Sequence, residues 1–292
     1  MNALAARRIV ADYYGLTKPR IAVLLLITTY AAMVMAARGL PPLGLTLLTL
    51  AGGALAAGSA AAFNCVFDRD LDRMMARTML RPIATGRISP AAGAAFATLL
   101  GAVSFALLYL YVNPLAAWLS LGGNLYYVVI YTLWLKRTTP LNIVIGGAAG
   151  AVPPLVGWTA VAHSVGAPAL GMFALIFLWT PPHFWALALF SNADYERAKV
   201  PMLPVVHGVR RTKIEIFAYT VVLVSVSLAL TPLGVMGWWY FVPAALLGAV
   251  FLWDAWKMLD GPTQPLARAL FKYSLLYLAL MCVAMVLDRV IR

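Results

Sequence analysis

Three side chains that can bind a metal through oxygen, Asn64, Asp68 and Asp72, follow one another at intervals of four residues. On a helix this interval turns each side chain by roughly 40° from the one before, so all three lie on one face. Asp70 points to the other side of the same helix. Two carboxylates one helical turn apart provide oxygen ligands of the kind that Mg²⁺ binds. The spacing therefore predicts a site for a hard divalent cation.

Arginines surround this acidic face. The stretch NCVFDRDLDRMMARTMLRPIATGR, residues 64–87, lies between two long apolar runs and contains Arg69, Arg73, Arg77 and Arg81. A guanidinium group binds phosphate oxygens through paired hydrogen bonds, and a bound metal bridges the same phosphates. The stretch as a whole indicates a site for a phosphorylated ligand at the edge of a membrane.

The composition is that of a protein embedded in a lipid bilayer. Of 292 residues, 63% are hydrophobic and 11% are charged, and the mean hydropathy is +0.87. These values exclude a soluble domain and predict an all-α, polytopic membrane protein with one transmembrane domain over residues 1–292. Nine helices of the length that crosses a bilayer are expected, at 21–37, 43–63, 91–112, 115–135, 141–162, 168–190, 214–233, 238–257 and 271–288.

Basic residues set the predicted orientation. The net charge is +12, yet 19 of the 22 basic residues fall on one side if the N-terminus is cytoplasmic; only Arg38, Arg289 and Arg292 fall on the other. This positive-inside pattern places the N-terminus in the cytoplasm and the C-terminus outside. It also explains the charge without nucleic-acid binding. No small-residue cleavage site follows the first apolar run, so we expect the first helix to be retained.

Small residues and a second ionic cluster predict how the site is positioned. The 43–63 helix contains the segment AGGALAAGSAAAFN at 51–64, whose small side chains allow close helix approach and should draw its acidic end into the bundle. A second cluster follows the 168–190 helix on the same side: Asp194, Glu196, Arg197 and Lys199. Because the second and sixth helices both lead into ionic segments, we expect two loosely repeated four-helix units facing each other, with a ninth helix added.

Two groups of basic residues at helix ends have alternative interpretations. Lys18, in the segment LTKPR, and the pair Lys136-Arg137 either reach a cavity on the cytoplasmic side or only anchor their helices at the interface.

The 141–162 helix combines two kinds of feature. Gly146 and Gly150 have the spacing of close helix packing. Pro153-Pro154 is expected to interrupt the helix, as happens where a cavity is lined.

A histidine lies within the 168–190 helix, after Pro181-Pro182, which should kink it. His183 has Trp179 and other aromatic residues as neighbours. A histidine inside a membrane is a candidate functional residue, but it can equally be a hydrogen-bonded packing residue, or a ligand for a haem or a proton.

Together these features suit a diphosphate on a lipid tail. Metal and cations would hold the diphosphate while an apolar cavity receives the hydrocarbon. Neutralising a leaving diphosphate is the electrostatic task in ionising an allylic carbon. Aromatic faces in the cavity could shelter the resulting carbocation.

The pattern Asn64-xxx-Asp68-xxx-Asp72 resembles the first motif of the UbiA-type intramembrane prenyltransferases. Four segments resemble more closely the haem-farnesylating subfamily: LTKPR at 16–20, ARTMLRPIATGRISP at 76–90, WTPPHFWALAL at 179–189 and DYERAKVPMLPVV at 194–206. The resemblance covers residues 13–208. The first motif alone would be a weak sign of the subfamily, but four such segments in this order are specific for it.

This resemblance implies a nine-helix bundle in the cell inner membrane, with its active face and cavity on the cytoplasmic side. It implies transfer of the farnesyl group of farnesyl diphosphate to a vinyl group of haem b, with water capturing the cation to give haem O. Mg²⁺ would be held with the diphosphate by Asp68 and Asp72, assisted by Asn64. Haem A synthase or terminal-oxidase assembly factors are the implied protein partners.

The resemblance also assigns the remaining site residues. The diphosphate would be bound by Arg73, Arg77, Arg81, Lys136, Lys199 and Asp194. The haem or substrate cavity would contain His183, Trp179 and Tyr195. The second motif of the wider family has two aspartates four residues apart, whereas here position 198 is Ala198. This departure puts a second full metal site in doubt.

Two alternatives remain open. A prenyltransferase for an aromatic quinone precursor would have a similar site, although the segments TPPHFW and PMLP favour haem. A transporter of an anionic substrate also has broken helices and buried charge, but its charges should lie near the bilayer midplane. A phosphatidyl-alcohol transferase would need an Asp-Gly-x-x-Ala-Arg stretch that this sequence lacks.

Overall fold

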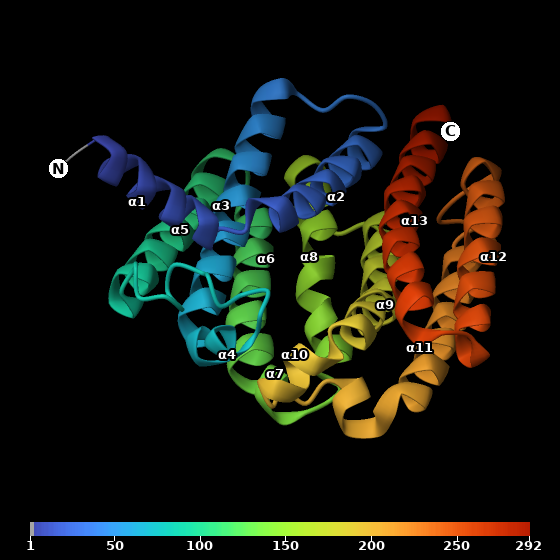
Figure 1. Cartoon of the computed structure of the whole chain (residues 1–292). Helices are drawn as coiled ribbons and strands as arrows, with labels where there is room; N and C mark the ends of the chain where they lie inside the picture. The colour runs from blue at the N-terminus through green and yellow to red at the C-terminus, as the bar shows by residue number, and fades with distance from the viewer. Residues whose placement is uncertain (1–2) are drawn as a thin grey trace.

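The computed structural model describes residues 3–292, which contain helices and no strand. Eight of the helices are long and apolar enough to cross a membrane, as the composition predicted (Figure 1). These eight are α2 (Pro19–Ala37), α3 (Leu43–Phe67), α5 (Pro90–Tyr111), α8 (Asn142–Ala162), α9 (Ala167–Phe190), α11 (Leu203–Ala229), α12 (Trp238–Asp260) and α13 (Thr263–Ile291).

The helix expected at 115–135 is built in two parts. It begins as α6 (Pro114–Leu125) and continues as a π-helix, η1 (Tyr126–Leu135), before the short α7 (Lys136–Thr138). The wider π-helical turn changes which residues share a face, and such turns are frequent at functional sites. The count of nine spans and the orientation of the termini stay predictions.

Three local expectations differ from the structure. α11 begins at Leu203 rather than near 214, with a break at Gly208, whose φ is 78°. Residues Ala3–Leu16 form a further helix, α1, ahead of the first helix that the sequence predicted at 21–37. The predicted interruption at Pro153-Pro154 is wrong, because α8 continues through both prolines. Their fixed φ is close to the helical value, so they remove hydrogen bonds without ending a helix held by its neighbours.

Glycines bring the helices of the bundle into close contact. A Cβ on Gly157 would lie 2.1 Å from the Thr29 carbonyl oxygen, so α8 and α2 meet backbone to backbone. A Cβ on Gly146 would lie 2.3 Å from the Tyr131 ring, which confirms the close packing predicted there. Gly150 differs: nothing lies within 4 Å of its Cβ position, and it lines a cavity instead.

The polar connections gather at one end of the bundle (Figure 1). There the short helices α4 (Arg69–Met74), α7 and α10 (Asn192–Arg197) lie together. Hydrogen bonds join them: Arg137 donates to Asp70 at 2.7 Å, and the Ala76 amide donates to Asp194 at 3.4 Å. The fold therefore brings both ionic segments of the sequence to the same end.

Candidate active site

Asn64, Asp68 and Asp72 lie buried where α3 passes into α4. α3 ends at Phe67, but the backbone hydrogen bonds continue at the four-residue interval, from the Asp68 amide to Asn64 and from the Asp72 amide to Asp68. The exposed fractions of the three residues are 4%, 0% and 3%. The Asn64 amide also donates to Asp68 Oδ2 at 2.7 Å. The burial predicted for this face is therefore observed, although the helix is not continuous.

A basic residue from a different segment contacts each member of this triad. Lys136, the first residue of α7, donates to Asp68 Oδ2. Arg81, in the loop after α4, donates to both oxygens of Asp72 at 2.8 and 2.9 Å. Lys18, which precedes α2, donates to Asn64 Oδ1 at 2.5 Å.

The electrostatics of these cations differ. Burial lowers the pKa of Lys18 to about 8. Burial also acts to lower the pKa of Arg81, but the Asp72 carboxylate outweighs it and holds that pKa above its ordinary value. Arg81 is therefore a permanent charge at the triad, whereas Lys18 titrates close to neutrality.

Asp70 takes no part in the triad, as its position on the helix predicted. Its side chain is 56% exposed and forms a two-armed ion pair with Arg137 at 2.7 and 2.8 Å. The hydrogen bond from Arg137 lowers the pKa of Asp70 to about 2. Arg137 approaches Asp68 only to 3.8 Å.

The second ionic segment contacts the first through an aromatic residue. Arg77 donates to the Tyr195 hydroxyl at 2.8 Å, and its guanidinium carbon lies 5.1 Å from the Tyr195 ring centroid. Tyr195 is buried, and its neighbour Asp194 is paired with Arg197 at 3.6 Å. The contact ties α10 to the loop that carries Arg81.

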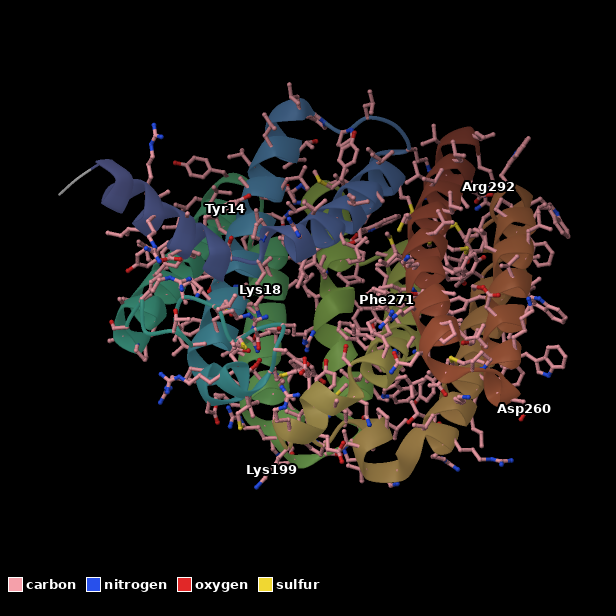
Figure 2. All side chains as sticks on the ribbon, viewed as in Figure 1. Tyr14, Lys18, Lys199, Asp260, Phe271 and Arg292 are labelled. Carbon is pink, nitrogen blue, oxygen red and sulfur yellow. The ribbon has the colours of Figure 1, made fainter. Side chains whose placement is uncertain are left out.

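Two predicted phosphate ligands lie apart from the triad. Arg73 donates through Nε to the Ala84 carbonyl at 2.8 Å and so holds the loop after α4. Lys199 is exposed, has a positive φ of 52°, and points away from the bundle (Figure 2).

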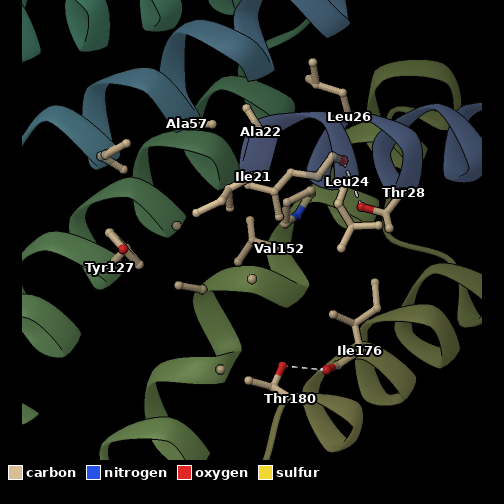
Figure 3. Close-up of a pocket in the computed structure, with 18 of the residues that line it drawn as sticks. Ile21, Ala22, Leu24, Leu26, Thr28, Ala57, Tyr127, Val152, Ile176 and Thr180 are labelled. Atoms are coloured by element: carbon tan, nitrogen blue, oxygen red, sulfur yellow. Dashed lines mark hydrogen bonds between the residues drawn. The ribbon is translucent and has the colours of Figure 1, made fainter. Parts of the chain in front are cut away.

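A largely apolar cavity of 670 Å³ adjoins the triad. It lies between α2, α3, α6, η1, α8, α9 and α13. Figure 3 shows Tyr127 and Val152 on its wall, with Ile176 and Thr180 below them. Lys18, which contacts Asn64, lines this cavity together with Tyr127 and Tyr131. The cavity is of the size that receives a drug-sized ligand.

His183 and Trp179 line the same cavity, whereas Tyr195, which was expected with them, is not one of its lining residues. Other lining residues were not singled out by the sequence: Tyr127, Tyr131, Thr180 and Phe271. Ser274, on α13, was also missed, although it accepts the Trp179 indole hydrogen bond through its carbonyl at 2.7 Å. A serine in an apolar helix gives no sequence signal of such a contact.

The triad fits a magnesium ion whose coordination is completed by oxygen atoms of the substrate phosphates. Among residues 3–292 no three His, Cys, Asp or Glu residues form a metal-binding group. Mg²⁺, however, is commonly bound by one or two carboxylates together with phosphate oxygens and water. Asp68 Oδ1 is buried without a hydrogen-bond partner in the described part of the chain, which is an acceptor left free for such an ion.

Comparison with known proteins gives the class of this chain. Residues 25–280 match the UbiA prenyltransferase family, and the chain belongs to that family. The chain is 56% identical over 281 residues to the Protoheme IX farnesyltransferase of Gloeobacter violaceus, covering 96% of this chain and 92% of that protein. It is 51% identical to the protein of the same name from Picosynechococcus, covering 96% and 89%.

Solved structures show the same fold. A digeranylgeranylglyceryl phosphate synthase superposes with a TM-score of 0.80 at 18% identity, covering 97% of this chain and 99% of that one. A UbiA homolog from Archaeoglobus fulgidus bound to GPP and Mg²⁺ gives 0.64 at 16%, covering 94% and 99%. The chain is thus a multi-pass membrane protein with the UbiA-type helical bundle.

Proposed function

We propose that this chain transfers the farnesyl group of farnesyl diphosphate to a vinyl group of haem b, giving haem O and diphosphate. The observation that carries the proposal is a buried carboxylate pair, matched by cations, beside an apolar cavity of 670 Å³. The name shared by relatives that are 51–56% identical supports haem as the acceptor.

Asp68, Asp72 and Asn64 would hold Mg²⁺, which when bound supplies a Lewis acid for the departing diphosphate. Arg81, Lys18 and Lys136 would neutralise phosphate oxygens, assisted by Arg77. In the reaction the allylic C–O bond breaks and its electron pair leaves with the diphosphate. The vinyl group then attacks the allylic carbon, and water adds to the new cation and loses a proton.

The apolar cavity has a separate task in this proposal. Its walls hold the farnesyl chain and exclude water from the allylic cation until the vinyl group has reacted. Tyr127 and Tyr131 line the cavity, and an aromatic face there would stabilise the allylic cation.

The proposed setting follows the sequence prediction. The chain would form one domain of two four-helix units and a last helix in the cell inner membrane, with the triad facing the cytoplasm. Haem A synthase or a terminal-oxidase assembly factor would receive the product.

The test is turnover by the purified chain in nanodiscs with haem b, farnesyl diphosphate and Mg²⁺. We expect haem O by mass spectrometry, no product without farnesyl diphosphate, and no product from Asp68→Asn. Asp70→Asn is the matched control, because it removes an exposed carboxylate from the same segment. Prenylation of an aromatic quinone precursor with haem left unmodified would refute the acceptor, and substrate flux without covalent product would indicate a transporter.

A further inference from the structure

His183 is held with both faces of its ring covered. The ring stacks on Trp179 at a centroid distance of 4.2 Å and on Phe271 at 4.5 Å, with interplanar angles of 18° and 23°. Its exposed fraction is 6%. Neither face is open to a ligand, so only the nitrogen-bearing edge of the imidazole can bind one.

Hydrogen bonds determine which ring nitrogen carries the proton. His183 Nδ1 lies 2.7 Å from the Ser274 hydroxyl oxygen, and this hydroxyl lies 2.7 Å from the Phe271 carbonyl oxygen. A hydroxyl has one proton. If Ser274 donated it to Nδ1, two oxygen atoms would face each other at 2.7 Å without a proton between them. Both contacts are satisfied only when Nδ1–H donates to Ser274 and Ser274 donates to Phe271.

The other nitrogen, Nε2, is consequently unprotonated. It has no hydrogen-bond partner in the described part of the chain, and His183, Trp179 and Phe271 all line the cavity. Nε2 is not one of the fully buried atoms that lack a partner in the described part of the chain, so it is accessible from the cavity. A lone pair that opens into an apolar cavity is suited to a ligand that accepts electrons.

We propose that His183 Nε2 binds the iron of haem b as an axial ligand and so positions the acceptor for prenyl transfer. This rests on the function proposed above. Neutral imidazole is the form that binds metals, and the second ring nitrogen of such a ligand normally donates a hydrogen bond that fixes the tautomer. Ser274 is the positioning residue that provides this bond.

Aromatic stacking adds orientation to this arrangement. The Trp179 indole is itself fixed by its hydrogen bond to the Ser274 carbonyl, so one residue of α13 restrains both neighbours in α9. These contacts therefore fix the orientation of the imidazole ring. A macrocycle bound through iron would take a set tilt in the cavity, and one vinyl edge could then be presented repeatedly to the farnesyl carbon.

The test is a haem titration of the purified chain in nanodiscs, followed by absorption and resonance Raman spectroscopy. Wild type should show an iron–histidine stretching band and should bind haem more tightly than iron-free protoporphyrin IX. In His183→Ala the band and this preference should disappear, and added imidazole should restore the band. Ser274→Ala should shift the band and weaken haem binding by about 10-fold, and Ser274→Thr should reverse both effects.

A second ligand variant separates loss of the iron bond from loss of the fold. His183→Met should give the spectrum of a thioether-ligated iron. If His183 has only a structural role, this variant should have the same spectrum as wild type. Farnesyl diphosphate binding should persist in all four variants. Suppose that wild type forms haem O and that the iron spectrum of His183→Ala is unchanged. This result would overturn only the proposal that His183 is an axial ligand. No saturable haem binding and no haem O from wild type would instead overturn the proposed function.

One further result would contradict ligation. If His183→Ala kept the haem spectrum but released a farnesylated haem that lacks the added hydroxyl, Nε2 would be the acceptor of the proton from water.

Discussion

Asp68→Asn should destabilise the protein and stop turnover for two separable reasons. The Asp68 side chain is fully buried and pairs with Lys136, whose side chain is 15% exposed. Removing one partner of a buried ion pair typically costs about 3–5 kcal/mol, because the other charge remains unpaired. We expect the lower end of that range, since the partial exposure of Lys136 lets water reach its ammonium group.

The double variant Asp68→Asn with Lys136→Met separates stability from chemistry. With neither charge present, the free energy of unfolding should return to within about 1 kcal/mol of wild type. Turnover should stay at least ~100-fold low, because a group that stabilises the leaving diphosphate is still missing. Thermal unfolding in detergent measures the first quantity, and haem O formation at saturating substrates measures the second.

Recovered turnover in the double variant would refute the reasoning. Asp68 would then serve only to neutralise Lys136, and the metal site would have to lie elsewhere. Asp70→Asn, which breaks an exposed pair with Arg137, should keep wild-type turnover and lose at most about 1 kcal/mol of stability.

Three further predictions concern charges around the triad. The pKa of Asp70 lies at about 2, below its usual 3.8, so the stabilisation from its pair with Arg137 is present above pH 3.8 and lost as the pH falls toward 2; the difference in melting temperature between wild type and Asp70→Asn should shrink over that range. Lys18, with a pKa of about 8, loses its proton as the pH rises past 8, so the KM for farnesyl diphosphate should rise between pH 7 and 9 in wild type and stay flat in Lys18→Arg; a flat wild-type profile would argue against a charged Lys18 at the diphosphate. Arg81→Ala should raise the same KM about 10–100-fold with kcat less affected, because the guanidinium that pairs with Asp72 is lost; a defect that persists unchanged at saturating diphosphate would contradict that role.

The sequence predicted features that depend on local geometry. A four-residue interval places side chains on one helical face wherever a helix forms, so the burial of Asn64, Asp68 and Asp72 followed from the small residues of α3. Apolar windows likewise located the eight long helices. These predictions needed no knowledge of which segments meet.

Contacts between distant segments could not be predicted in the same way. Asn64 is 46 residues from Lys18, and Asp68 is 68 residues from Lys136. The sequence left anchoring and cavity contact open for both lysines, because either role places a basic residue at a helix end. Lys199 has the same chemistry, but the backbone turn after α10 directs it outward. Only the tertiary fold distinguishes these cases.

Under the proposed function, charge balance favours a single metal at the triad, and Ala198 stands in place of the second aspartate that the resemblance led us to expect. Three cations, Lys18, Arg81 and Lys136, surround two carboxylates, so the assembly carries one excess positive charge. An ionised diphosphate ester brings roughly three negative charges. With Arg77 left out of this count, one Mg²⁺ then makes the triad, its three cations and the diphosphate neutral, which is the condition favoured where charges are removed from water. A second metal would leave two positive charges unbalanced. Under the proposed function, the two lysines from distant segments and Arg81 from the adjoining loop therefore make a single magnesium ion sufficient.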